Sequence, residues 1–217
     1  MLVVFGSRAY YRTVGHGVFH CERCGGDRAY RQRSGRRWVR VLNVPVVPLD
    51  ATGEHLRCTI CHTCYRVELL AVPTIEQMRA ALLAGTTASA LAMLWAGGAT
   101  SQAARRRAVR LIADAGSAEY SEAHLVTALA DPEKSASLPA ASGPVPGLGP
   151  AIEGLAVQLE MHAREWFLAN VVQVGLADGP LSVAERKVVS AVARYLGMSQ
   201  AQAQDVIWLA EEAAQAG

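Results

Sequence analysis

The sequence predicts an α+β protein in which a small antiparallel β-unit is followed by an all-helical bundle. Three observations support this prediction. All five cysteines lie before residue 65. Residues 1–70 contain 11 basic and five acidic residues, whereas residues 71–217 contain ten basic and 14 acidic residues. Hydrophobic residues make up 51% of the chain but aromatic residues only 6%, and this alanine-rich composition suits helices better than a thick β-sandwich.

The same composition sets the domain organisation. A charged fraction of 18% beside 51% hydrophobic residues excludes a disordered chain, and the unlike charge of the two parts excludes one homogeneous domain. We expect domains at residues 1–72 and 73–217, with a Pro/Gly-rich internal loop at 131–150. Because the odd number of closely spaced cysteines follows no signal peptide, we expect reduced thiols, a cytoplasmic protein and no disulfide-stapled scaffold.

The cysteines of the first domain form two C-x-x-C pairs. Cys21 and Cys24 are separated by 33 residues from Cys58 and Cys61. Two residues between thiolates let one tight turn present both sulfurs to a tetrahedral ion, and a distant second turn completes the shell. The spacing predicts a structural Zn²⁺ site with four thiolate ligands. Cys64 offers an alternative pair with Cys61, but we favour Cys58 and Cys61, because bulky Tyr65 follows Cys64 where a turn needs positive φ.

The chain between the cysteine pairs is predicted to form strands. Residues 37–44 are rich in β-branched side chains, and residues 43–50 carry two prolines that confine them to an edge. Residues 51–53 form the next predicted turn, and residues 65–70 the closing strand. Such a sheet is too small to be stable without its metal.

The segment between the cysteine pairs also carries a run of arginines with interleaved aromatic residues. Guanidinium groups bind phosphate and aromatic rings stack on bases, so the run is a candidate nucleic-acid surface. The alternative is a solvated or protein-facing basic surface around a dianionic zinc centre. The candidate residues are Arg28, Arg31, Arg33, Arg36, Arg37 and Trp38.

The second domain is predicted to be helical throughout. Thr74 with Gln77, and Ser199 with Gln202, have the spacing of capping boxes that start helices. The uncharged stretch 80–104 contains too many small and polar residues for a membrane span, so we expect buried, tightly packed helices and no transmembrane segment. Further helices are expected at 102–115, 120–130, 151–177, 183–196 and 200–215.

Two segments of the helical domain repeat a helix, an Asp/Gly turn, a serine cap and a second helix with an early glutamate. Asp178-Gly179 is followed by Ser182-Val-Ala-Glu185, and Asp114-Ala115-Gly116 by Ser121-Glu122. This pattern resembles the TerB-like domain associated with tellurite resistance, and the first 70 residues resemble a bacterial zinc-ribbon module. The resemblance implies a divalent cation such as Ca²⁺ or Mg²⁺ at Asp178, Glu185, Asp114 and Glu122, and protein partners in stress-response assemblies. Ser182 with Glu185 is also explained by a capping box alone.

The sequence favours a protein that binds metal without catalysing a reaction. A four-thiolate shell is closed, and no G-x-S-x-G or H-E-x-x-H motif is present. We therefore expect a non-enzymatic metal-binding adaptor similar to TerB-family proteins of the tellurite or chemical stress response. The alternative is a nucleic-acid-binding regulator that uses the arginine-rich hairpin.

Overall fold

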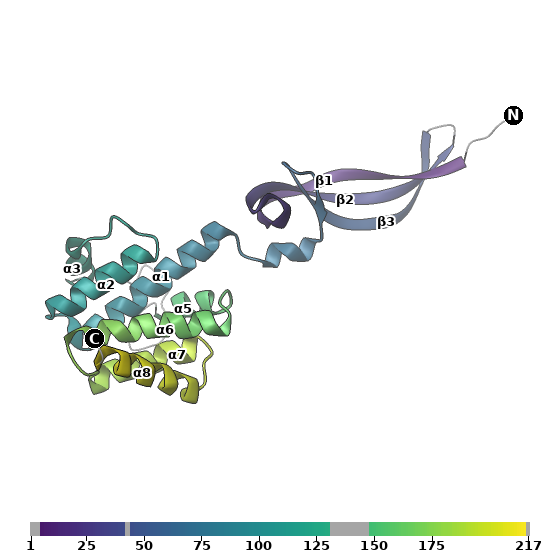
Figure 1. Ribbon diagram of the computed structural model, residues 1–217. Helices are drawn as coiled ribbons and strands as arrows, with labels where there is room; N and C mark the ends of the chain where they lie inside the picture. Colours follow the sequence, from purple (N-terminus) through teal and green to yellow (C-terminus); the bar gives the residue numbers. More distant parts are fainter. Residues whose placement is uncertain (1–4, 42–43, 131–147, 216–217) are drawn as a thin grey trace. The chain divides into compact units, whose positions relative to one another are not determined.

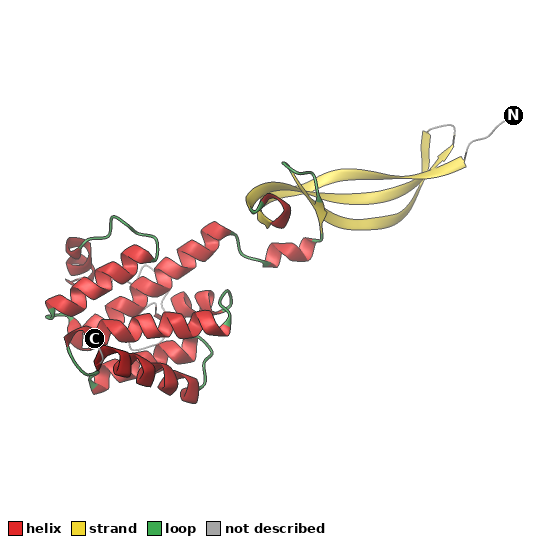
Figure 2. Ribbon diagram, viewed as in Figure 1, coloured by secondary structure: helices red, strands yellow, loops and turns green. Residues whose placement is uncertain are grey.

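The computed structural model describes residues 5–41, 44–130 and 148–215, and it divides into two compact units, Met1–Gln77 and Met78–Gly217. The first unit is a four-stranded antiparallel sheet with strand order β1-β2-β3-β4, and the second is built of α-helices (Figures 1 and 2). The predicted α+β class, with the sheet first and the helices second, is confirmed.

Three long strands run side by side in the first unit (Figure 1), and β4 extends the sheet by a short pair with β3. Strand pairing is interrupted by bulges, one of them near Gly35. The strands are β1 Phe5–Cys21, β2 Gly26–Val41, β3 Val44–Cys58 and β4 Cys64–Tyr65.

The strand predictions for this unit were partly wrong. The predicted turn at 51–53 lies inside β3, where Gly53 takes a φ of 83° beside the bulge. The predicted strand at 65–70 stops at Tyr65, and Val67–Ala71 forms a 3-10 helix instead. A 3-10 turn satisfies its backbone groups locally, so this segment needs no further strand as a partner.

The core of the sheet unit is small and surrounds the cysteines. Phe19, Cys21 and Cys58 are buried together, and the rings of Tyr30 and Tyr65 meet Phe19 edge-on at 5.7 and 5.3 Å between ring centroids. The far end of β3, by contrast, is exposed along eleven residues. The sheet therefore owes most of its burial to the region where the two C-x-x-C pairs meet.

The second unit has its own hydrophobic core, to which every helix contributes. Helix α1 passes directly into a π-helical turn, Leu94–Gly98, and its second half is buried from Gly85 to Leu94 apart from Thr87. The helices are α1 Ile75–Met93, α2 Gln102–Asp114, α3 Glu122–Ala130, α5 Leu148–Ala156, α6 Met161–Gly175, α7 Val183–Tyr195 and α8 Gln200–Gln215.

The predicted capping boxes start their helices as expected. Thr74 and Gln77 exchange hydrogen bonds at 3.2 and 2.9 Å at the start of α1, and Ser199 and Gln202 do so at 3.3 and 2.9 Å at the start of α8. These pairs satisfy amides that the first helical turn leaves without partners.

The prediction of a single helix at 151–177 was wrong, because α5 ends at Ala156 and α6 begins at Met161. The guanidinium of Arg164 stabilises this break by donating to the carbonyl oxygens of Ala156, Leu159 and Leu196 at 2.8–2.9 Å. Most of the predicted internal loop, residues 131–147, lies outside the described residues, and residues 148–150 begin α5.

One helical stretch among the described residues, Val67–Gly98, is long and apolar enough to cross a membrane by length and composition. Its most apolar window has a mean hydropathy of 1.4, and half of that window is buried inside the protein. Core helices of globular proteins pass the same test, so this stretch is weak evidence for a span.

Candidate metal centre

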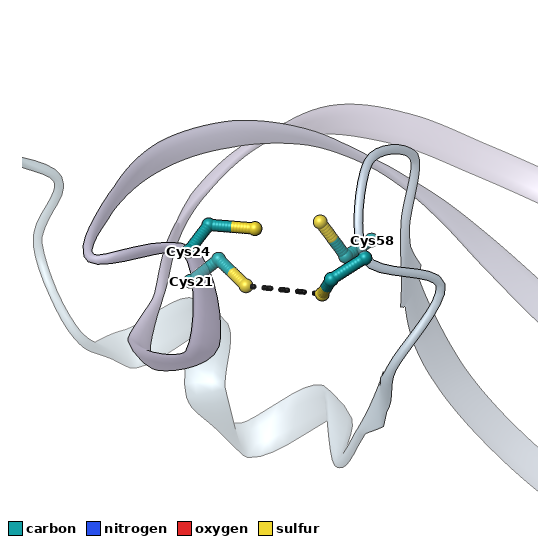
Figure 3. Close-up of side chains that lie close together, drawn as sticks. Cys21, Cys24 and Cys58 are labelled. Carbon is teal, nitrogen blue, oxygen red and sulfur yellow. Dashed lines mark hydrogen bonds between the residues drawn. The ribbon is translucent and has the colours of Figure 1, made fainter.

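The sulfur atoms of four cysteines come together at one end of the sheet. Cys21, Cys24, Cys58 and Cys61 all place their sulfurs within 4.8 Å of one another, and those of Cys21 and Cys61 are 3.7 Å apart. Zinc binds thiolates at about 2.3 Å, which separates the sulfurs of a tetrahedral shell by ~3.8 Å. The four thiols are therefore spaced for one tetrahedral ion, and in Figure 3 the side chains of Cys21, Cys24 and Cys58 point into a common space.

Two similar turns present these sulfurs. The first turn follows β1, and Gly25 just after Cys24 has a φ of 63°. The second turn follows β3, and His62 just after Cys61 has a φ of 58°, the one positive φ of a non-glycine residue in the described part of the chain. A hydrogen bond from the Cys58 amide to the Thr63 carbonyl closes the second turn at 3.0 Å. The left-handed residue after each pair reverses the chain so that both thiols face the same side.

The structure separates the two alternative cysteine registers. Cys61 belongs to the cluster, whereas Cys64 is exposed on β4, paired across the sheet with Arg57. Cys61 was favoured over Cys64 from the sequence because bulky Tyr65 follows Cys64. The structure adds the reason that Cys61 works, since its successor His62 adopts the left-handed conformation itself.

The surroundings of the cluster give its thiols different acidities. Hydrogen bonds from the side chain and backbone of Thr63 lower the pKa of Cys61 to about 6. Burial and the neighbouring thiols raise the pKa of Cys24 to about 12. Burial alone would raise the pKa of Cys21, but hydrogen bonds from Tyr65 and from the backbone of Cys24 outweigh it, and the pKa is lowered. Metal binding would displace the remaining thiol protons, since the thiolate is the ligand.

Tyr65 belongs to this site, although sequence analysis placed it only at the start of a strand. Its hydroxyl lies 3.3 Å from the sulfur of Cys21 and accepts a hydrogen bond from the Arg23 amide at 3.4 Å. A hydroxyl beside a thiolate stabilises the negative charge and orients the ligand. The spacing of cysteines carries no signal for this contact, because Tyr65 reaches Cys21 only through the pairing of β3 with β4.

The cysteine-bearing sheet is compatible with a zinc ribbon. Together with the helical bundle it makes a two-unit protein, and its described residues contain one cluster of metal-ligating side chains. A family model, that of the tellurite resistance protein TerB, matches residues 84–206. The chain therefore belongs to the TerB family. No curated protein and no solved structure matches the chain.

The helical unit contains an internal repeat, but its register differs from the expected one. Ser101 caps α2 by accepting from the Ala104 amide, as Ser182 caps α7 by accepting from the Glu185 amide, 81 residues later. Both helices are 13 residues long, and each is followed by a glycine with positive φ, Gly116 or Gly197, again 81 residues apart. The sequence pattern instead sets residues 111–116, at the end of α2, against residues 176–179, in the 3-10 turn after α6. At the 81-residue spacing, the first copy keeps the serine but has no counterpart of the two acidic residues.

The four carboxylates predicted to bind a second cation do not form a cluster of metal-ligating side chains among the described residues. In the repeat, the positions of Asp178 and Glu185 correspond to Gly97 and Ala104, whereas Asp114 ends α2 and Glu122 begins α3. Glu122 pairs with Arg105 at 2.9 Å instead. Among the residues that the structure describes, the cysteines are the one group of three or more metal-ligating side chains. The second cation therefore stays a prediction.

Glu185 has a structural role that the structure shows directly. The side chain is 4% exposed, and its carboxylate accepts a hydrogen bond from the Ser182 amide at 2.8 Å to complete a capping box. It packs against Gly97, where an added Cβ would lie 3.0 Å from the carboxyl carbon. Asp178 is exposed in the turn before α7.

The six residues predicted as a nucleic-acid surface are divided between the two faces of the sheet. They all lie on β2, where side chains alternate in direction, so Arg31, Arg33 and Arg37 share one face. Arg28, Arg36 and Trp38 share the other. The nucleic-acid alternative thus stays a prediction. The pairing of β2 with β3 also places Arg57 opposite Arg31, so Arg57 joins the basic residues of this sheet, although it was not singled out from the sequence.

Proposed function

We propose that this protein is a non-enzymatic metal-binding adaptor of the tellurite or chemical stress response. In this proposal zinc holds the ribbon together and the TerB unit binds protein partners. The observation that carries the proposal is the cluster of four thiols, whose sulfurs lie within 4.8 Å of one another. Membership of the TerB family supports the link to tellurite resistance.

The composition of the cluster favours a structural ion. Four thiolates are a soft ligand set that suits zinc, and a four-coordinate sulfur shell leaves no position for water or substrate. Catalytic zinc sites instead combine three protein ligands with an open position. The free thiols also suit a reducing compartment, which supports the cytoplasm as the location.

The helical unit offers apolar surface for a protein partner. Trp166 on α6 and Trp208 on α8 are 57% and 58% exposed, and Leu209 beside Trp208 is 57% exposed. Aromatic side chains are enriched in protein–protein interfaces, and in a soluble protein such exposure favours an interaction role.

Cobalt substitution tests the structural nature of the site. With Co²⁺ in place of zinc, we expect the strong visible absorption of a tetrahedral thiolate complex, unchanged by added azide or cyanide. A spectrum that shifts with these small ligands would show an open coordination position and would contradict the structural role.

The link to stress is tested in a strain from which the gene has been deleted. Restoring the wild-type gene should raise survival on tellurite, and the Cys58→Ser variant should not, because it lacks the zinc ligand. The Cys64→Ser variant is the matched control and should restore survival. Equal survival of the deletion strain and the wild type would remove tellurite from the proposal.

A further inference from the structure

A cavity of about 260 Å³ opens on the ribbon beside Cys58. Three arginines line it, Arg31, Arg33 and Arg57, together with the hydroxyl-bearing Thr13 and Thr59. His62, from the second cysteine turn, completes the lining. The cavity is thus built from all three long strands and from the turn that presents Cys58 and Cys61.

Strand register explains why the arginines converge. Arg31 on β2 lies directly opposite Arg57 on β3, and Arg33 follows two residues later on the same face of β2. Thr13 on β1 is the pairing partner of Arg33. The backbone pairing therefore places the three arginines side by side, and all three line the same cavity.

The positive charge of this cavity is not neutralised by acidic side chains. None of the three arginines forms an ion pair with a carboxylate in the part of the chain that the structure describes. The guanidinium of Arg33 lies over the ring face of Tyr11, at 5.8 Å from the centroid. Like charges directly opposite in a sheet are destabilising, and an anion between Arg31 and Arg57 would relieve this repulsion.

The size and the donors of the cavity indicate which anion it takes. Pockets for drug-sized ligands occupy about 300–1,000 Å³, so this cavity suits one small group rather than a whole nucleotide. Guanidinium groups bind phosphate through paired hydrogen bonds, and the Thr13 hydroxyl adds a further donor, whereas the Thr59 hydroxyl donates to the Ala29 carbonyl at 2.9 Å.

We propose that the cavity between Arg31, Arg33 and Arg57 is a binding site for a phosphate group. The phosphate comes from a nucleic-acid backbone or from a free phosphate compound, which share this chemistry. The site adjoins the metal centre, and the turn after Cys58 supplies Thr59 and His62, so it forms only when the ribbon is folded. The adaptor role proposed above does not depend on this site.

The test uses the zinc-loaded full chain and two probes, inorganic phosphate and a fluorescent single-stranded DNA oligonucleotide. Binding is followed by calorimetry for phosphate and by fluorescence anisotropy for DNA at low salt. Arg57→Gln and Arg31→Gln remove cavity arginines, and Arg28→Gln removes an equal charge from the opposite face of β2. Zinc content and thermal unfolding establish that each variant is folded.

We expect at least a tenfold loss of phosphate binding in both cavity variants and wild-type binding in Arg28→Gln. DNA that binds far more tightly than phosphate, and is displaced by it, would identify a nucleic-acid source. Comparable affinities would identify a free phosphate compound. If neither probe binds the wild type, or if Arg28→Gln loses as much binding as Arg31→Gln, the site is refuted. The arginines would then balance only the charge of the metal centre.

Discussion

Replacing Cys58 with serine removes a buried ligand of the proposed zinc centre and should unfold the ribbon. In the described part of that unit, the largest fully buried side chains are Phe19 and Leu56. Burial of each contributes about 1.5–3 kcal/mol. A structural zinc site contributes about 10–16 kcal/mol in small zinc-dependent domains. Because the metal term exceeds the contribution of these two side chains, loss of one ligand removes the dominant stabilisation of the unit.

Two measurements check this prediction on the purified full chain. Zinc content should fall from one equivalent to none in Cys58→Ser, and amide hydrogen exchange should show loss of protection in the ribbon strands. The helical unit has its own core, so its free energy of unfolding should stay within about 0.5 kcal/mol of the wild type. Cys64→Ser is the control and should keep one zinc. One zinc in Cys58→Ser, or none in Cys64→Ser, would refute the ligand assignment.

Three further substitutions test local features. Glu185→Ala should destabilise the helical unit by about 1–2 kcal/mol in urea unfolding, because it removes a buried capping-box carboxylate, whereas exposed Glu212→Ala should change nothing measurable. Gly154→Ala should stabilise the same unit by about 0.5–1 kcal/mol, because an added Cβ there meets open space within a helix. Gly97→Ala should not stabilise it, because its Cβ would lie 3.0 Å from the Glu185 carboxyl group. Equal effects of the two substitutions would contradict this packing. Asp27→Asn should lower the thermal stability of the ribbon at neutral pH. Burial would raise the pKa of Asp27, but amide hydrogen bonds at the start of α1 outweigh burial and lower this pKa. The ionised carboxylate therefore stabilises the fold above its unfolded-state pKa near 3.9. This stabilisation disappears as pH falls through the folded-state pKa. A difference from wild type that persists below that pH would contradict the sign.

Features encoded by short spacings were predictable from the sequence. The cysteine pairs and the capping boxes depend on residues three apart, which one turn of chain brings together whatever the rest of the protein does. The preference for Cys61 over Cys64 was also a local argument, about the conformation of the residue that follows.

Features that depend on distant pairing were not predictable in the same way. β1 lacks a clean alternation of apolar residues, because much of it is exposed on both faces, and sequence analysis therefore placed no strand there. Arg57 joins Arg31 only through the β2–β3 register, and Tyr65 reaches Cys21 only through β4. The repeat register was missed because Gly97 and Ala104 replace the two acidic residues that mark the second copy.

We claim that one zinc ion is bound by four cysteine sulfurs. X-ray absorption at the zinc edge of the purified full chain measures the number, kind and distance of the ligands at once. We predict four sulfur ligands at about 2.3 Å and no nitrogen or oxygen in the shell. A shell that contains a histidine nitrogen or water oxygen, or a purified chain without stoichiometric zinc, would contradict the claim.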